Sequence, residues 1–379
     1  MTSLTFYGGA NEIGGNKILL EDKGAKIYLD FGESFNFGDD YFYEYLAPRT
    51  ANGLEVLFEF DLIPKIPKLY SKEILKFTDL KYEKPDIDAI FISHSHSDHV
   101  GHLPYVDEDI PVYLGHGTHR IIDIYHKLFP ALYDIGEHNN IIEFKSGDKI
   151  KIKHLVIEPI HVEHSVPATY GFVIHTSTGP IVYTGDLRMH GPRSDMTNDF
   201  VQRATEVKPN ILLCEGTRMK YESEHNYTEK EVEDKVSKIV AESKGFVFAH
   251  FSMLNTDRIM TFYNAAIANK RKLIIDTRLA YIIHNLKDKI SVLPDVMKDP
   301  NVLVYFRLCK SCTFDKMDYF PWERDFLPKM VTYKDINGHQ NKFIMHLGFY
   351  KLMELVYLQP QNADFIYSSS EHFYEGEDN

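Results

Sequence analysis

The chain has 379 residues, 44% of them hydrophobic, and a formal charge of −13 at pH 7. This size and hydrophobic content predict a globular protein with a large core and about two domains. The excess of acidic side chains argues against a protein that holds nucleic acid by broad neutralisation of phosphates, although divalent ions bound in a cleft would reverse the sign locally.

Hydrophobicity and cysteine usage indicate the cellular compartment. No run of about 18 apolar residues occurs, and the first residues lack the layout of a signal peptide. Three cysteines cannot make a disulfide framework, which fits a reducing environment. We therefore predict a soluble, cytoplasmic protein without membrane contacts. Cys309 and Cys312 have the spacing of half a zinc ribbon, but no second half exists, so two thiols without a metal are the favoured interpretation.

The first 215 residues consist mainly of predicted strands. Each is a short apolar run with β-branched or aromatic members, and several end in a polar residue followed by glycine or a histidine-rich loop. The runs are residues 26–30, 89–93, 171–175, 181–184 and 211–215. Because a sheet holds strand ends rigidly while loops vary, we expect the chemistry at these ends.

After about residue 218 strands alternate with helices. Thr228 and Glu231 form a capping box that opens a helix ending at Gly245, and a second helix begins at Thr256. Predicted strands are residues 246–249, 273–276, 302–306 and 365–367. Such alternation is typical of a parallel sheet, so we predict a second α/β lobe and an α/β fold class overall.

The main chemical signal is the sequence His94-Ser-His96-Ser-Asp98-His99, directly after the strand at 89–93. In extended chain, residues two apart face the same way, so His94 and His96 can share one ion. Asp98 and His99 can hold a second. Imidazole with carboxylate favours Zn²⁺, with Mn²⁺ as a substitute, and we predict one or two ions.

Further ligands must come from elsewhere in the chain. His164 precedes one strand and Asp186 follows another, and a carboxylate at Asp186 can bridge two ions. His161 competes with His164 for the third position. Asp30 ends the first long strand and suits a supporting role, accepting a hydrogen bond from a ligating imidazole. Taken alone, Asp30 or Asp186 is more simply a turn former or a helix cap.

Together these residues resemble the metallo-β-lactamase superfamily, with its H-x-H-x-D-H motif, and more narrowly the β-CASP nucleases of the ribonuclease J type. The opening at residues 8–16, the settings of His164 and Asp186, and an acid closely followed by threonine at Glu215 and Thr217 carry the likeness. It implies a metallo-β-lactamase αββα sandwich over residues 1–218 and a β-CASP-type cap over 219–379. It also implies that His94, His96 and His164 hold one ion, Asp98 and His99 the other, with Asp186 bridging, and that Asp30 and Glu215 support catalysis with Asp98.

One feature departs from the family pattern. β-CASP nucleases carry two more histidines after the cap, whereas residues 364–373 resemble the strand that closes it. Neither His346 nor His372 has the family's setting, so neither is assigned. Three explanations remain open: the protein is truncated or split, a partner chain or homo-oligomer completes the site, or the second site has decayed. In each case we expect the second ion to bind more weakly than the first, because it lacks a ligand.

The function that follows is a zinc-dependent phosphodiester hydrolase, a ribonuclease acting on single-stranded RNA by metal-bound hydroxide oriented by Asp98. DNA is the alternative substrate, and endonuclease and exonuclease action both remain open. The rival interpretations are a small-molecule metallo-hydrolase of the same fold and a degenerate, non-catalytic partner subunit. Candidate contacts to the nucleic acid backbone are basic side chains whose simpler role is solvated surface charge, namely Arg188, Arg218, Arg258 and Lys272.

Overall fold

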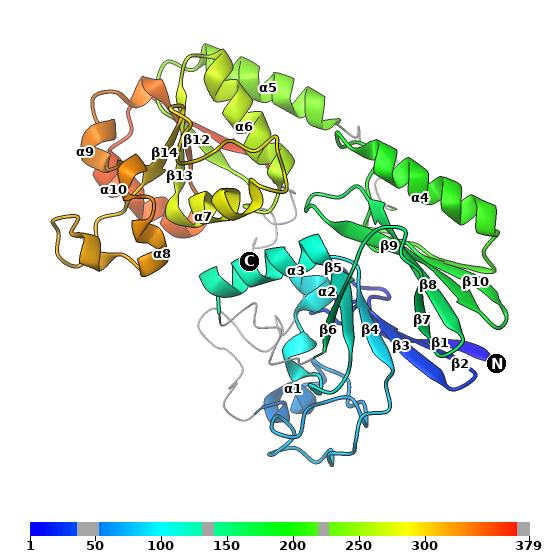
Figure 1. Cartoon of the computed structure of the whole chain (residues 1–379). Coiled ribbons are helices and arrows are strands. Elements are labelled where there is room, and N and C mark those ends of the chain that lie inside the picture. The colour runs from blue at the N-terminus through cyan, green and yellow to red at the C-terminus, as the bar shows by residue number, and fades with distance from the viewer. Residues whose placement is uncertain (36–52, 131–139, 218, 220–226, 370–379) are drawn as a thin grey trace. The chain divides into compact units, whose positions relative to one another are not determined.

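A computed structural model describes residues 1–35, 53–130, 140–217, 219 and 227–369. The chain divides into two compact units (Figure 1). Unit 1 comprises Met1–Met189 and Arg193–Glu224, and unit 2 comprises His190–Pro192 and His225–Asn379. No helix among the described residues is long and apolar enough to cross a membrane.

Two sheets form the centre of unit 1. The first has the order β1-β2-β3-β4-β5-β6, antiparallel from β1 to β3 and parallel from β3 to β6. Its strands are β1 (Thr2–Gly8), β2 (Lys17–Asp22), β3 (Ala25–Leu29), β4 (Ala89–Ile92), β5 (Val112–Gly115) and β6 (Ile141–Phe144). The second has the order β11-β10-β9-β8-β7, antiparallel except for the β10–β11 pair. Its strands are β7 (Ile150–Ile152), β8 (Leu155–Val162), β9 (Thr169–Thr176), β10 (Gly179–Tyr183) and β11 (Ile211–Leu213).

Apolar side chains from both sheets pack into one core, which includes Phe91 of β4 and Phe172 of β9 with ring centroids 5.8 Å apart. Helices cover the outer faces (Figure 1). Beside the first sheet lie α1 (Glu55–Glu59), α2 (Ser97–Val100) and α3 (His116–Leu128), and a second apolar cluster forms there. On the second sheet lies α4 (Ser194–Val207), packed through Phe200. Unit 1 is therefore an αββα sandwich, as predicted.

Unit 2 is built on one parallel sheet with the order β15-β14-β13-β16-β12-β17. The predicted capping box of Thr228 and Glu231 is confirmed and opens α5. The strands are β12 (Val247–His250), β13 (Lys272–Asp276), β14 (Val302–Tyr305), β15 (Met330–Val331), β16 (Phe343–His346) and β17 (Asp364–Tyr367). The helices are α5 (Glu229–Glu242), α6 (Thr256–Ala268), α7 (Thr277–Leu286), α8 (Pro321–Arg324), α9 (Tyr333–Ile336) and α10 (Leu355–Leu358), with a 3₁₀ segment at Phe349–Glu354.

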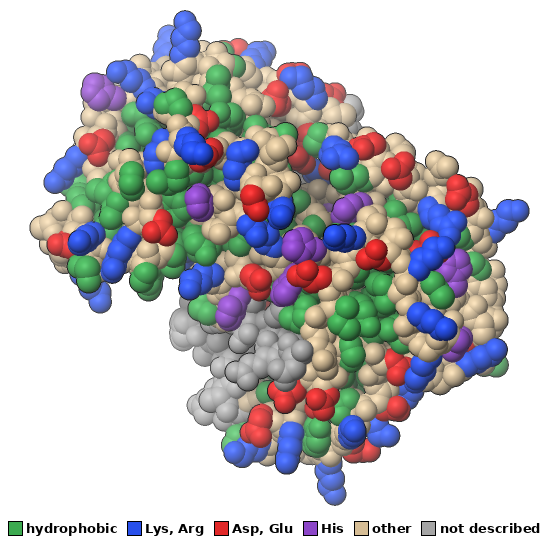
Figure 2. All heavy atoms as spheres, viewed as in Figure 1, with side chains coloured by type: hydrophobic (Ala, Val, Ile, Leu, Met, Phe, Trp, Pro, Cys, Tyr) green, Lys and Arg blue, Asp and Glu red, His purple; other side chains and the backbone are tan. Residues whose placement is uncertain are grey.

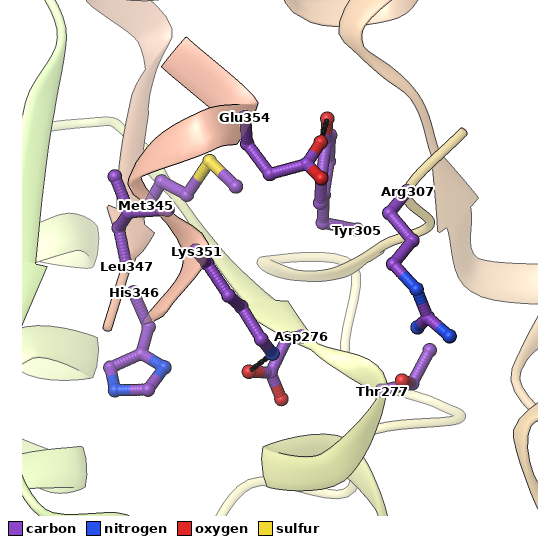
Figure 3. Close-up of a pocket in the computed structure, with 9 residues that line it drawn as sticks. All are labelled: Asp276, Thr277, Tyr305, Arg307, Met345, His346, Leu347, Lys351 and Glu354. Atoms are coloured by element: carbon purple, nitrogen blue, oxygen red, sulfur yellow. Dashed lines mark hydrogen bonds and ion pairs between the residues drawn. The ribbon is translucent and has the colours of Figure 1, made fainter. Parts of the chain in front are cut away.

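A pocket lies where the direction of the chain reverses in this sheet. From β13 the chain moves to β14 on one side, whereas from β16 it moves past β12 to β17 on the other. Such a reversal opens a crevice at the carboxyl ends of parallel strands. There Lys351 forms an ion pair with Asp276, and the ring of His346 lies beside the pair (Figure 3).

The Asp276–Lys351 pair predicts how the stability of unit 2 depends on pH. Burial would raise the pKa of Asp276, but Lys351 outweighs it and lowers the pKa from 3.8 to about 2. Because the folded pKa lies below the unfolded value, the pair stabilises the fold above about pH 4, and this is lost as the pH falls towards 2. The difference corresponds to about 2 kcal/mol.

The test compares wild type with Asp276→Asn, which keeps an oxygen to accept the Leu279 N–H at the start of α7. We expect the free energy of unfolding in urea to fall more steeply between pH 5.5 and pH 3 in wild type than in the variant. Parallel pH profiles would contradict this assignment.

Candidate metal centre

The histidine-rich loop runs from the end of β4 into α2. His94 and His99 are fully buried, and Asp98 is 5% exposed. The backbone at the end of β3 fixes this loop, because the Phe31 N–H donates to the His99 carbonyl oxygen at 2.9 Å. Gly32 is required for this approach, since a Cβ there would lie 1.7 Å from the Asp98 carbonyl oxygen. The loop is thus held by the first sheet before any ion binds.

Three imidazole nitrogens converge beside this loop. His96 Nδ1 lies 3.0 Å from His94 Nε2 and 3.3 Å from His164 Nε2. Asp186 Oδ2 lies 4.0 Å from His94 Nε2 and 3.7 Å from His164 Nε2. Donors about 2.1 Å from a tetrahedral ion lie ~3.4 Å from one another. These spacings fit a divalent ion held by three histidines and one aspartate.

A second group of donors shares Asp186 with the first. His99 Nε2 lies 3.3 Å from Asp186 Oδ1 and 3.4 Å from Asp98 Oδ2. Ligand atoms of His94, His99 and Asp186 lie within 4.8 Å of one another. The two oxygens of Asp186 therefore face different groups of donors, as a bridging carboxylate would.

Burial keeps the first three imidazoles neutral. It lowers the pKa of His164 to about 3 and holds the pKa of His94 well below 6.5, and it also lowers the pKa of His96. A neutral imidazole offers a nitrogen lone pair, which is the form that binds a metal. The first group is therefore in the metal-binding state throughout the neutral pH range.

The second group carries concentrated negative charge. Burial would lower the pKa of His99, but the carboxylates of Asp98, Asp30 and Asp186 outweigh it and raise that pKa well above 6.5. In turn, although burial alone would raise it, the pKa of Asp186 is lowered, most strongly by His99. Buried carboxylates facing one imidazole nitrogen need a proton or a cation between them. This part of the site therefore also fits a divalent ion.

Asp30 lies behind His99. It is fully buried and accepts hydrogen bonds from the Ser93 backbone N–H at 2.7 Å and from the Ser93 hydroxyl at 2.8 Å. The Tyr183 hydroxyl donates to it at 2.6 Å, and His99 Nδ1 lies 2.7 Å away. Since a carboxylate only accepts, His99 Nδ1 carries a proton, and Nε2 is the nitrogen that faces the donor group. The structure thus places Asp30 next to a proposed ligand and not among the donors themselves.

Other candidate residues lie outside the two groups. Glu215 is half-buried and accepts a hydrogen bond from the Thr217 N–H at 3.1 Å. His161 packs its ring against Tyr170, with centroids 4.4 Å apart. Arg218 and His372 lie outside the described residues.

An ion pair that the sequence did not reveal joins the loops of His164 and Asp186. Arg188 Nη2 donates to Glu163 Oε1 at 2.6 Å, and the Arg188 backbone N–H donates to the Glu163 carbonyl oxygen at 2.8 Å. Both side chains are less than 10% exposed. The sequence shows only that Glu163 directly precedes His164 and that Arg188 follows Asp186 by two residues. The pair fixes the two ligand loops relative to each other.

Comparison with known proteins agrees with this geometry. Residues 71–225 match the family described as "Beta-lactamase superfamily domain". This match covers the part of unit 1 that carries most of the donors, and a fold of this kind implies binding of a divalent metal.

Two curated relatives match most of this chain. Ribonuclease J of Mycoplasma pneumoniae is 25% identical over 322 residues, which cover 82% of this chain and 49% of that protein. Ribonuclease J of Helicobacter pylori (strain ATCC 700392 / 26695) is 26% identical over 278 residues, covering 72% of this chain and 36% of that protein. The chain is thus similar to proteins named ribonuclease J and spans about half the length, or less, of these relatives.

A solved structure shares the fold over nearly the whole chain. It is a protein of unknown function from Enterococcus faecalis V583, with a TM-score of 0.69 and 18% sequence identity. The match covers 97% of this chain and 88% of that chain. It supports the fold alone.

Proposed function

We propose that the protein is a zinc-dependent phosphodiester hydrolase that cleaves single-stranded RNA. The observation that carries this proposal is the shared Asp186, whose two oxygens face two adjacent groups of metal donors. Paired metal sites suit in-line displacement at phosphorus. Similarity to proteins named ribonuclease J supports RNA as the substrate class.

The side chains of the site have separate tasks. His94, His96 and His164 would hold one ion, and Asp98 and His99 the other, with Asp186 between them. When bound, zinc ions acidify water and neutralise charge on phosphoryl oxygens. Although burial alone would raise it, the pKa of Asp98 is lowered, most strongly by His99, so the carboxylate is ionised at neutral pH and could accept a hydrogen bond from the attacking water.

The hydrogen-bonded network behind His99 keeps the site in one geometry. Asp30 fixes the His99 ring through Nδ1, and this leaves Nε2 directed at the donor group. Orientation of this kind lowers the cost of reorganisation when the substrate binds.

Two of the four basic side chains predicted to contact RNA are held in ion pairs. Arg188 forms an ion pair with Glu163, and Arg258 Nε donates to Glu229 Oε2 at 2.8 Å. Each arginine is therefore already paired with an acidic residue of its own unit. Lys272 is exposed. Acidic and basic side chains are interspersed on the face shown in Figure 2. Affinity for RNA should therefore depend on the ions more than on a broad basic surface.

Two alternative functions would give different experimental results. A small-molecule hydrolase of the same fold would turn over a generic phosphodiester such as bis(p-nitrophenyl) phosphate and leave RNA intact. A non-catalytic partner subunit would bind little metal. The acidic net charge favours the first alternative, and the convergence of donors opposes the second.

The test uses end-labelled single-stranded RNA and DNA with the purified chain, supplied with Zn²⁺ or stripped by a chelator. We expect zinc-dependent cleavage of RNA, and we expect His96→Ala to reduce it about a thousandfold or more, to the rate of the stripped protein. His116→Ala is the matched control, because His116 is half exposed and pairs with Glu143 outside the site. Intact RNA together with hydrolysis of the small diester would reject the ribonuclease proposal.

A further inference from the structure

Asn16 lies beside the second group of donors. It immediately precedes β2, and its backbone N–H donates to the Asp98 carbonyl oxygen at 3.1 Å. Its own carbonyl oxygen accepts from the Gly32 N–H at 3.0 Å. Two backbone hydrogen bonds thus fix Asn16 against the metal-binding loop, whatever its side chain does.

The side chain of Asn16 reaches His99. Its amide Nδ2 atom lies 3.3 Å from His99 Nε2. That nitrogen faces the donor group, because the other ring nitrogen, Nδ1, faces Asp30. The amide therefore lies at the atom that would bind the second ion.

Three polar atoms surround His99 Nε2 at nearly equal distances. Asp98 Oδ2 lies 3.4 Å, Asp186 Oδ1 3.3 Å and the Asn16 amide 3.3 Å from His99 Nε2. Donors that share an ion at about 2.1 Å have edges of ~3.4 Å. The amide of Asn16 has the spacing of a fourth ligand.

We propose that Asn16 is a ligand of the second divalent ion through its side-chain oxygen, Oδ1. This rests on the proposed metal centre. Amide oxygen and nitrogen exchange places by a half-turn about the last side-chain bond, and their assignment follows from the surrounding hydrogen bonds. Either end of the amide can therefore face His99 Nε2, and an ion bound there would favour the oxygen.

Gly9 leaves room for this rotation. A Cβ at Gly9 would lie only 2.4 Å from the present Oδ1 position, and Gly9 has φ +81°, which side chains rarely adopt. The absence of a side chain there lets either end of the amide face the Gly9 backbone.

This ligand gives the two sites different chemistry. By this proposal the first site would have three imidazoles and one oxygen of Asp186, whereas the second would have the imidazole of His99 and three oxygens from Asp98, Asp186 and Asn16. Imidazole suits zinc, while carboxylate and carbonyl oxygens suit harder ions such as Mn²⁺. We expect Mn²⁺ to compete with Zn²⁺ better at the second site than at the first.

The experiment is calorimetric titration of the stripped full-length chain with Zn²⁺, and separately with Mn²⁺ counted by electron paramagnetic resonance. Asn16→Ala should bind the first Zn²⁺ as wild type does and the second at least about tenfold more weakly. Asn16→Asp supplies a carboxylate oxygen and should bind the second ion at least as tightly as wild type. Asn198→Ala, an exposed asparagine of α4, should leave both affinities unchanged.

The two substitutions at Asn16 separate a ligand from a hydrogen-bond donor. If the amide is only a hydrogen-bond donor to His99, Asn16→Ala should bind the second Zn²⁺ as tightly as wild type or more tightly. In that case Asn16→Asp should also bind the second Zn²⁺ no better than Asn16→Ala. Either result would overturn the proposal. Thermal unfolding in chelator checks that the variants fold.

Failure of the proposed function gives a different result. If unit 1 does not bind metal as proposed, wild type itself will bind no Zn²⁺ tightly, and the Asn16 variants cannot then be compared with it. Two ions in wild type with unchanged binding in Asn16→Ala would reject Asn16 alone.

Discussion

Replacing Asp186 by alanine is expected to abolish metal-dependent cleavage of RNA and to weaken both ions. The carboxylate faces both groups with separate oxygens, Oδ2 lying 3.7 Å from His164 Nε2 and Oδ1 3.3 Å from His99 Nε2. Removing it takes a ligand from each ion and leaves two sets of donors without a bridge. We expect a loss of cleavage of about a thousandfold or more, together with a fall in bound zinc.

Zinc per chain and cleavage of labelled RNA are measured in parallel. Asp195→Ala is the control, because Asp195 is exposed and pairs with Arg193 on the surface. A protein that lacks Asp186 yet retains its zinc and cleaves RNA at the wild-type rate would show that this carboxylate does not bridge the sites.

The second large effect is expected at Asp30. Its carboxylate accepts from Ser93, Tyr183 and His99 in a fully buried position. Asp30→Ala leaves these donors without an acceptor, and it places alanine at φ 57°, a left-handed conformation. We expect the free energy of unfolding to fall by about 3–5 kcal/mol.

Urea unfolding of the stripped protein measures this loss. Asp61→Ala is a matched control, because Asp61 also has a left-handed backbone, φ 54°, but is exposed. The control should lose only the backbone contribution, about 1–2 kcal/mol. Equal losses in both variants would mean that the hydrogen bonds of Asp30 contribute nothing.

The donors of the candidate site could be predicted because they stand at strand ends. The sequence 94–99 follows β4, His164 lies between β8 and β9, and Asp186 follows β10. Strand β4 belongs to the first sheet, whereas β8, β9 and β10 belong to the second. The strand pattern therefore marks each donor loop in the sequence, and the packing of the two sheets brings these loops together.

Residues whose role depends on a contact with another part of the chain could not be predicted in the same way. Glu163 and Arg188 read as ordinary charged residues until the fold pairs them, and Asn16 lies 83 residues before His99. Nothing in local spacing distinguishes them from surface polar residues. Their roles come from tertiary packing alone.

Two helices of unit 1 were also missed where strands were expected to predominate. Neither helix begins with a side-chain cap, whereas the predicted α5 begins with a capping box. Both have an apolar face that packs on a sheet, so they were missed for want of a start signal and not for want of a helical period.

The most direct test of the metal centre is an anomalous difference map from crystals of the zinc-loaded chain. The assignment predicts a peak about 2.1 Å from His94 Nε2, His96 Nδ1 and His164 Nε2, with a second peak ~3.5–4 Å away beside His99 and Asp186. A map without density among the three imidazoles, in protein shown to bind zinc, would contradict it.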